Sequence, residues 1–261
     1  MNIIKQITKY PIKGLSGQNL ESVFLEQNQV LPGDREFAFA RSNVKFNPEE
    51  PVYLKKSNFL ALVKEEKLAR LKTEFNSSTQ QLKIKIDGKN VFNENLANEE
   101  NIRKVEYFFQ NFLNFSKEEK PTLVRGIEGK TSLLKHSFSD LPDKAISILN
   151  LKSIQDFESK LGRQISPLRF RANILINGNQ PWEEFNWIGK KVVIGTSVLK
   201  IFKRTQRCAA TNVNPESAER DINLPNEIKN YYGHFDLGVY AQVIKSGLIS
   251  INNRLETNET S

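Results

Sequence analysis

The chain has very few of the side chains with which proteins bind metals directly. Its 261 residues contain one cysteine, Cys208, and two histidines, His136 and His234. Structural zinc sites use about four Cys or His ligands, and iron–sulfur clusters are held by several thiolates, so this sequence excludes both. A single cysteine also cannot form an internal disulfide, and we therefore expect the protein in the cytoplasm.

Long apolar runs and glycine-rich fingerprints are also missing. No apolar run approaches the roughly 20 residues that span a bilayer, and residues 1–7 alternate like a strand instead of resembling a signal peptide. The 13 glycines are scattered along the chain, and no Gly-x-Gly-x-x-Gly fingerprint is present. We therefore expect no membrane partner and no nicotinamide or flavin site in this polypeptide.

Acidic residues are outnumbered by basic ones, 30 against 38, which gives a net charge of +8. Such a charge can indicate nucleic-acid binding. Here the lysines and arginines are dispersed among polar and acidic residues, so we expect no nucleic-acid partner. Arginines that stand within apolar segments are better explained by a buried anionic ligand.

The patterns that are present indicate short strands and a few helices. In the first half, short apolar or alternating segments predict strands near residues 3–12, 22–25, 36–40, 59–63, 68–75 and 82–86. Phenylalanines at helical spacing predict a helix over residues 99–115. In the second half, strands are expected near residues 172–177, 192–194, 198–202 and 239–244.

Two further helices are expected in the second half. One covers residues 150–161 and ends at Gly162, and the other lies near residues 225–232. The sequence therefore predicts a mixed, β-rich α+β fold. We expect an N-terminal domain over residues 1–116, a second domain over residues 117–254 and a polar tail over residues 255–261.

Cys208 has neighbours that favour reactive chemistry. It follows an apolar, β-branched run and stands in the segment 204–215, Arg-Thr-Gln-Arg-Cys-Ala-Ala-Thr-Asn-Val-Asn-Pro. Nearby arginines stabilise a thiolate. A lone cysteine is more often a small buried hydrophobic residue, and both interpretations stay open at this point.

Four segments, in the same order along the chain, resemble one protein family. Residues 207–215 resemble the cysteine signature of the MOSC domain, which is named after the C-terminal domain of molybdenum-cofactor sulfurase. Residues 10–17, Tyr-Pro-Ile-Lys-Gly-Leu-Ser-Gly, and 31–37, Leu-Pro-Gly-Asp-Arg-Glu-Phe, resemble the family's N-terminal β-barrel domain. Residues 169–176, Arg-Phe-Arg-Ala-Asn-Ile-Leu-Ile, resemble a strand of the MOSC domain itself. Within the family, the chain is similar to the mitochondrial amidoxime reducing component and its bacterial relatives.

The resemblance implies an N-terminal β-barrel-like domain packed on a MOSC β-barrel domain with flanking helices. It also implies a molybdenum cofactor, whose pterin holds the metal through dithiolene sulfurs and ends in a phosphate. Cys208 is then the catalytic residue and metal ligand, and a soft thiolate suits such a site. The cofactor contacts that carry over are Lys13, Arg35, Arg171, Asn173 and Tyr240.

The local pattern adds further candidates around the cysteine. If residues near Cys208 continue a strand, Gln206 lies on the same face and can touch the cofactor, whereas Arg207 points the other way. Thr211 is placed to bond the loop backbone or the cofactor. Gln206, Arg207 and Thr211 are therefore included among the cofactor-binding candidates.

The arginines and a loop in the second half raise separate points. Arg169 and Arg171 share a face if their segment is a strand, and one of them is open to interpretation as a core salt bridge. Asp140-Leu141-Pro142 stands where related reductases carry a Thr-Ser-Pro cofactor contact. Tyr240 is equally open to interpretation as a core tyrosine.

These features favour an oxidoreductase that reduces N-hydroxylated or N-oxide small-molecule substrates. The alternative is a sulfur carrier or transferase that uses a Cys208 persulfide, and a third interpretation is non-catalytic cofactor storage. The chain offers no redox site of its own for NAD(P)H, so we expect a separate electron donor of the ferredoxin or flavin reductase type. No segment resembles the pyridoxal-phosphate-dependent desulfurase domain of full sulfurases, so we expect a free-standing MOSC protein.

Overall fold

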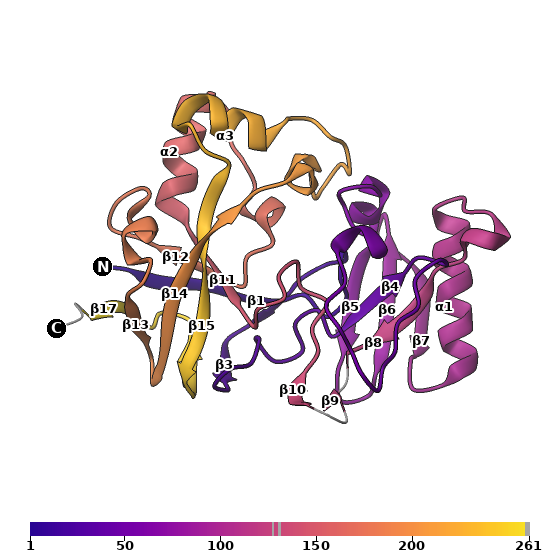
Figure 1. Cartoon of the computed structure of the whole chain (residues 1–261). Helices are drawn as coiled ribbons and strands as arrows, with labels where there is room; N and C mark the ends of the chain where they lie inside the picture. Colours follow the sequence, from indigo (N-terminus) through magenta and orange to yellow (C-terminus); the bar gives the residue numbers. More distant parts are fainter. Residues whose placement is uncertain (127, 130–131, 259–261) are drawn as a thin grey trace.

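The structure is a computed structural model that describes residues 1–126, 128–129 and 132–258. Its elements form two lobes that lie next to each other (Figure 1). One lobe is built on a large sheet with two helices, and the other on smaller sheets with one helix. The predicted mixed, β-rich fold is confirmed.

The larger lobe contains an eight-stranded sheet that curls into a half-barrel. In spatial order its strands are β17 (Leu255–Asn258), β13 (Lys191–Ile194), β14 (Ser197–Gln206), β15 (Asp236–Lys245), β11 (Ile146–Asn150), β12 (Ile174–Asn177), β1 (Ile3–Lys9) and β2 (Gln18–Leu20). A two-stranded pair, β3 (Ser22–Leu25) with β16 (Gly247–Ser250), belongs to the same lobe. Alternating residues such as Leu199 and Ile201 of β14 are fully buried in its core, as the two-residue period of a strand requires.

The smaller lobe collects the middle of the chain. Its strands are β4 (Phe37–Ala40), paired with β8 (Thr122–Arg125), and the three-stranded sheet of β5 (Lys72–Asn76), β6 (Gln81–Ile86) and β7 (Lys89–Asn95). A short pair, β9 (Glu128–Gly129) with β10 (Ser132–Lys135), lies beneath the junction of the lobes (Figure 1). Helix α1 (Glu99–Phe112) packs Val105 and Phe109 into the core of this lobe.

Two helices cover one side of the large sheet. They are α2 (Leu151–Leu161) and α3 (Leu224–Tyr232), drawn together at the top of Figure 1. Asn150 caps the start of α2 by accepting a hydrogen bond from the amide of Lys152, and Gly162 ends the helix in the left-handed conformation. Phe157 of α2 and Ile228 of α3 share one apolar core with residues of the sheet. All three predicted helices are thus confirmed, with small differences at their ends.

The chain crosses between the lobes more than once. β1, β2 and β3 belong to the larger lobe although they come first in the sequence, whereas β4 and β8 pair in the smaller lobe. Segments on either side of residue 116 therefore contribute to both lobes. Residues 255–258, expected within a polar tail, instead form β17 and pair with β13, and residues 259–261 lie outside the described residues.

Three strand predictions differ from the structure. Residues 66–70 form a 3₁₀ turn, so the strand expected over residues 68–75 begins only at Lys72. Within residues 59–63, only Phe59 makes a bridge, to Ala40, and turns follow it. Residues 167–170, which include Arg169, form a 3₁₀ turn that begins at Pro167, and Arg171 follows with a positive φ of 50°. Proline fits the first turn of a helix, and a left-handed residue ends it, so the strand begins only at Ile174.

None of the helices within the described residues is both long and apolar enough to cross a membrane.

Candidate functional site

The segments that connect the lobes surround a cavity of about 270 Å³. All nine residues that the sequence assigned to the site line this cavity, although they are spread over more than two hundred positions. They are Lys13, Arg35, Arg171, Asn173, Gln206, Arg207, Cys208, Thr211 and Tyr240. The tertiary fold therefore brings the four sequence motifs to one place.

Cys208 lies just beyond the end of β14 and is half-buried. It precedes the 3₁₀ turn Ala209–Asn212, and its carbonyl accepts hydrogen bonds from the amide of Thr211 at 3.0 Å and from its hydroxyl at 2.9 Å. The Thr211 side chain is thus used to fix the cysteine loop. This geometry holds the thiol at the wall of the cavity on a rigid backbone.

Lys56 is a cavity residue that sequence reasoning did not find. It lies at the start of a 3₁₀ turn, Lys56–Asn58, in the smaller lobe, and its ammonium group is close enough to Cys208 to interact with it electrostatically. Burial alone would lower the pKa of Lys56, but Cys208 and Asp140 more than offset this effect and raise it. No signal in the sequence separates Lys56 from surface lysines, because its contact with the cysteine is made between the two lobes.

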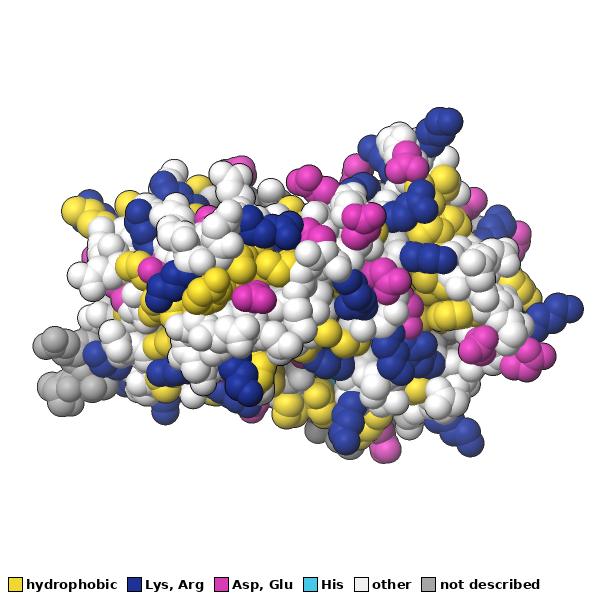
Figure 2. All heavy atoms as spheres, turned by 90° about the horizontal axis from the view of Figure 1, so that it is seen from above, with side chains coloured by type: hydrophobic (Ala, Val, Ile, Leu, Met, Phe, Trp, Pro, Cys, Tyr) yellow, Lys and Arg dark blue, Asp and Glu magenta, His cyan; other side chains and the backbone are white. Residues whose placement is uncertain are grey.

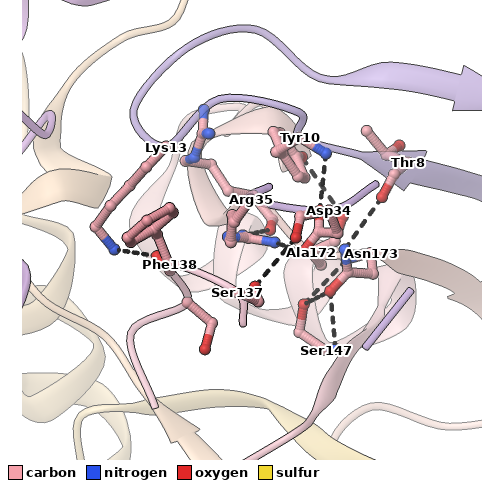
Figure 3. Close-up of polar contacts among 12 residues, drawn as sticks. Thr8, Tyr10, Lys13, Asp34, Arg35, Ser137, Phe138, Ser147, Ala172 and Asn173 are labelled. Carbon is pink, nitrogen blue, oxygen red and sulfur yellow. Dashed lines mark hydrogen bonds and ion pairs between the residues drawn. The ribbon is translucent and has the colours of Figure 1, made fainter. Parts of the chain in front are cut away.

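Arg35 and Arg171 lie side by side against Tyr10. Their guanidinium carbons lie 4.9 Å and 4.2 Å from the centroid of the Tyr10 ring. Both residues have left-handed backbones, with φ values of 51° and 50°, which are uncommon for residues other than glycine and tend to occur at functional sites. Arg35 also forms an ion pair with Asp34, and Asp34 in turn accepts a hydrogen bond from the Tyr10 amide at 2.8 Å. Figure 3 shows this group, which fixes the position of the Arg35 guanidinium.

One hydrogen-bond donor of the Arg171 guanidinium has no partner among the described residues. Its Nη1 donates to the carbonyl of Leu15 at 2.6 Å, whereas Nη2 is buried without a hydrogen-bond partner. Burial lowers the pKa of Arg171 to about 10, so the group stays charged at neutral pH. Burying a charged donor without a partner costs folding free energy unless an anion accepts its hydrogen bond. The site therefore fits a ligand with an anionic end.

Lys13 supplies a further cation, and Asp140 balances it. The Lys13 ammonium donates to the Phe138 carbonyl at 2.8 Å and forms an ion pair with Asp140 (Figure 3 draws the first contact). Burial lowers the pKa of Lys13, and the Asp140 carboxylate opposes this effect.

Gly14 follows with a φ of 82°, and a side chain there would lie 3.1 Å from the Leu60 carbonyl, so glycine suits this turn.

Asp140 lies at the edge of the cavity with half of its side chain exposed. Burial alone would raise its pKa, but Lys13, with smaller effects from Lys56 and Arg35, lowers it to about 2. The sequence identified this position only as a departure from related reductases. In the structure it is the carboxylate that faces the cations of the cavity.

Asn173 ties two strands together. Its amide oxygen accepts hydrogen bonds from the amide and hydroxyl of Ser147 at 3.1 Å and 2.9 Å, and its amide nitrogen donates to the Thr8 carbonyl at 3.2 Å (Figure 3). Thr8 is in β1, and Ser147 is in β11. Asn173 lines the cavity, but these bonds give it first of all a role in joining β1 to β11.

Arg169 and Arg207 use their guanidinium groups to hold the protein backbone. Arg169 forms an ion pair with Asp221 at 2.7 Å and donates to the Asn212 carbonyl at 3.0 Å. Arg169 is therefore the core salt bridge that the sequence left as one possibility. Arg207 donates through Nε to the Leu237 carbonyl at 2.8 Å and through Nη1 to the Phe170 carbonyl at 2.9 Å. Although Arg207 was assigned to the cofactor, its guanidinium is engaged with carbonyl oxygens behind the cysteine loop.

Gln206 and Tyr240 complete the wall near the cysteine. Gln206 ends β14 with an exposed side chain, whereas Arg207 is buried, so the alternation expected at this end of the strand is present. Tyr240 of β15 is half-buried, and burial raises the pKa of its hydroxyl despite the nearby Arg207. Tyr240 pairs across the sheet with Lys203 of β14, and both residues line the cavity.

The side chains available as metal ligands limit how this cavity can hold a metal. Across the described residues there is no group of three or more His, Cys, Asp or Glu side chains placed to hold a metal ion. Cys208 is the single thiol of the chain. A metal at this cavity would therefore take its other ligands from a non-protein group, and the partnerless Arg171 donor fits an anionic group of that kind.

Comparison with known proteins identifies a domain family and several relatives. Residues 134–256 match the family model of the MOSC domain. The chain is 34% identical to mitochondrial amidoxime-reducing component 1 of Mus musculus over 85 residues, which cover 32% of this chain and 24% of that protein. It is 26% identical to mitochondrial amidoxime reducing component 2 of Homo sapiens over 164 residues, which cover 54% and 48%.

The solved structure of YiiM from Geobacillus stearothermophilus aligns with a TM-score of 0.36 and 22% identity, covering 44% of this chain and 54% of that one. The matched regions thus span about half or less of the curated relatives. The expected family is nevertheless confirmed, because the matched domain contains the cysteine loop and the segment of Arg171. Residues 134–256, which make up just under half of the chain, form a MOSC domain.

Proposed function

We propose that this protein binds a molybdenum cofactor and reduces N-hydroxylated or N-oxide substrates, with Cys208 as the protein ligand of the metal. One observation carries the proposal. The only thiol of the chain shares a cavity with Lys13, Arg35 and Arg171, and one buried donor of Arg171 lacks a partner. A soft ligand and an anion-binding cluster are what a metal held by an anionic pterin requires.

The residues of this chain have distinct tasks in the proposal. Arg35 and Arg171, fixed against Tyr10, bind the phosphate end of the cofactor, and Lys13 adds a point charge. Thr211 holds the carbonyl of Cys208, so the thiol meets the metal with little loss of conformational freedom. The bound cofactor supplies oxygen-atom transfer, whereas the protein supplies binding, orientation and charge.

Similarity to relatives named as amidoxime-reducing components supports the choice of reaction. The substrate class remains a proposal for this chain, because the matched regions cover only part of those proteins. A separate electron-donor protein of the ferredoxin or flavin reductase type completes the proposed system. The sequence offers no nucleotide fingerprint through which NAD(P)H would act directly.

Metal and pterin content test the proposal without relying on activity. The protein is expressed in a host that makes the molybdenum cofactor, purified, and measured for bound molybdenum and for pterin released on denaturation. Near-stoichiometric amounts of both are expected, and Cys208→Ala should lose thiolate-dependent absorption and reductase activity while it keeps its far-UV circular dichroism. The matched control is Ser217→Ala, a small change in the neighbouring loop outside the cavity lining. Full activity in Cys208→Ala would refute the ligand role.

The alternative function is a sulfur carrier, and the contact between Lys56 and Cys208 favours it. Lys56 and Cys208 line the same cavity, and a cysteine can accept and donate sulfane sulfur through a persulfide. Purified protein without molybdenum, but with cyanide-labile sulfur that disappears in Cys208→Ala, would support this alternative. The same pair of measurements therefore distinguishes the two functions.

A further inference from the structure

The cavity holds two lysines that none of the cofactor assignments uses. Lys56 comes from the smaller lobe, and Lys203 comes from β14 of the larger lobe. Within the part of the chain that the structure describes, neither ammonium group has a carboxylate ion pair, whereas Lys13 and Arg35 are paired with Asp140 and Asp34. The charge of the two lysines is therefore available to a ligand.

The position of Lys203 is defined by the sheet. Lys203 lies opposite Tyr240 in the pairing of β14 with β15, and cross-strand partners project to the same face. Both residues line the cavity. The adjacent Arg204 is different, because its guanidinium lies 4.2 Å from the Phe185 ring and is already in contact with the protein.

Apolar side chains line the cavity alongside these lysines. Leu62, Val63 and Leu141 contribute to its lining, as does Tyr240. Leu62 and Val63 come from the smaller lobe, and Leu141 follows the Asp140 position. A ligand that suits this wall has an apolar or aromatic body, and one that suits Lys203 carries a negative charge.

The charge at Lys203 belongs to the cavity rather than to a broad basic face. Figure 2 shows that lysines and arginines are interspersed with aspartates and glutamates over the face seen from above. On this face no single basic patch gathers small anions. Selection of an anion therefore depends on the cations that line the cavity itself.

We propose that the Cys208 cavity selects small organic anions. Lys203 is the specificity-determining residue for the anionic group. The apolar body of the ligand packs against the wall formed by Leu62, Val63, Leu141 and Tyr240. Lys56, which contacts Cys208, meets the end of the molecule that lies near the thiol. The reaction that this selectivity serves rests on the proposed function. The preference of the cavity for binding anions does not depend on that function.

The test compares a matched anion and neutral analogue in both binding and turnover. Calorimetry measures binding of terephthalamate and of neutral terephthalamide to the purified protein. Turnover uses 4-carboxybenzamidoxime and its neutral 4-carbamoyl analogue with reduced methyl viologen as the electron donor. In that reaction the N–O bond breaks, electrons come from the viologen, protons come from solvent, and the oxygen leaves as water.

We expect the anionic compound to bind about two- to fivefold more tightly than its neutral analogue, which is the range of a single partly exposed ion pair. Lys203→Met should remove this preference through KM with little change in kcat, and Lys203→Glu should reverse it. The matched control Lys200→Met changes an exposed lysine of the same strand that does not line the cavity, and it should keep the preference.

Equal affinity of the wild-type protein for the anion and the neutral analogue would overturn the inference. Loss of the preference in Lys200→Met as well as in Lys203→Met would also overturn it, because the effect would then follow net charge. If neither amidoxime is reduced but the binding preference depends on Lys203, the proposed reaction fails and the anion selectivity stands.

Discussion

Arg35 donates a hydrogen bond of 3.1 Å from its Nη2 to the backbone carbonyl of Arg171, 136 positions away in the sequence. Both guanidinium groups also pack against Tyr10. This arrangement joins two motifs that come from different segments of the chain and brings their cations to one wall of the cavity. The position of each arginine thus depends on the other, and the pair forms one cationic unit at the cavity.

Removing this unit should weaken cofactor retention. The double variant Arg35→Ala, Arg171→Ala loses charge-assisted hydrogen bonds worth about 1.5–3 kcal/mol each, so we expect at least a tenfold loss of affinity for the cofactor. Pterin retained after gel filtration is the measurement. Arg125→Ala removes an arginine that pairs with Glu36 at the surface and should retain the cofactor like the wild type. Undiminished pterin in the double variant would contradict the assignment.

Arg169 should matter for stability in a way that its neighbour Arg163 does not. Both arginines pair with Asp221, but the Arg169 side chain is 3% exposed and that of Arg163 is 45% exposed. Arg169→Met leaves backbone carbonyls and Asp221 without this donor, so the free energy of unfolding should fall by about 2–4 kcal/mol. Arg163→Met should cost less than about 1 kcal/mol. Urea denaturation measures the free energy of unfolding of both variants. An equal loss in Arg169→Met and Arg163→Met would show that burial of Arg169 adds no stability to its ion pair.

The ion pair between Lys13 and Asp140 predicts a dependence of stability on acid pH. The pKa of Asp140 is about 2 in the folded protein and 3.8 by default, so the folded state favours the carboxylate. The stabilisation is complete above pH 3.8 and is lost as pH falls towards 2. Because the side chain is half exposed, solvent screening limits the effect to about 1 kcal/mol or less.

Asp140→Asn tests this dependence by removing the charge at nearly constant size. The free energy of unfolding of the wild type should exceed that of the variant at pH 5, and the difference should shrink as pH falls from about 4 to 2. Asp143→Asn, an exposed change in the same loop, is the control and should show no such convergence. A difference that is constant with pH would mean that the variant acts through packing instead.

Turnover should require an external electron donor. We expect the purified protein with NADH alone to leave an N-hydroxylated substrate unreduced, and reduced viologen or a ferredoxin- or flavin-type reductase to restore activity. The net charge of +8 favours an acidic partner, so rates with a protein donor should fall as salt screens the attraction. Viologen-driven rates should depend less on salt. Sustained NADH-driven reduction by the isolated chain would contradict this expectation.

Local patterns were sufficient for much of the secondary structure and for the location of the motifs. Helix α2 was predictable because its apolar face, its Asn150 cap and the terminal Gly162 all act within about one dozen neighbouring residues. The wrong strand prediction for Arg169 and Arg171 has a local cause as well. Pro167 favours a turn there, and the apolar residues that follow make the whole segment resemble a strand.

By itself, the sequence determined the β-rich class, the unique thiol and the set of motif residues, because these depend on composition and short-range spacing. Only the tertiary structure decided their tasks. Arg169 bonds Asp221 through its Nη2 and leaves only its Nε without a partner, and Arg207 bonds carbonyl oxygens. Arg171 instead leaves its terminal Nη2 without a partner, and no spacing rule distinguishes these three arginines. Lys56 reaches Cys208 only because the lobes pack together. Such roles depend on which groups are left without a partner after folding, and that is settled by long-range contacts.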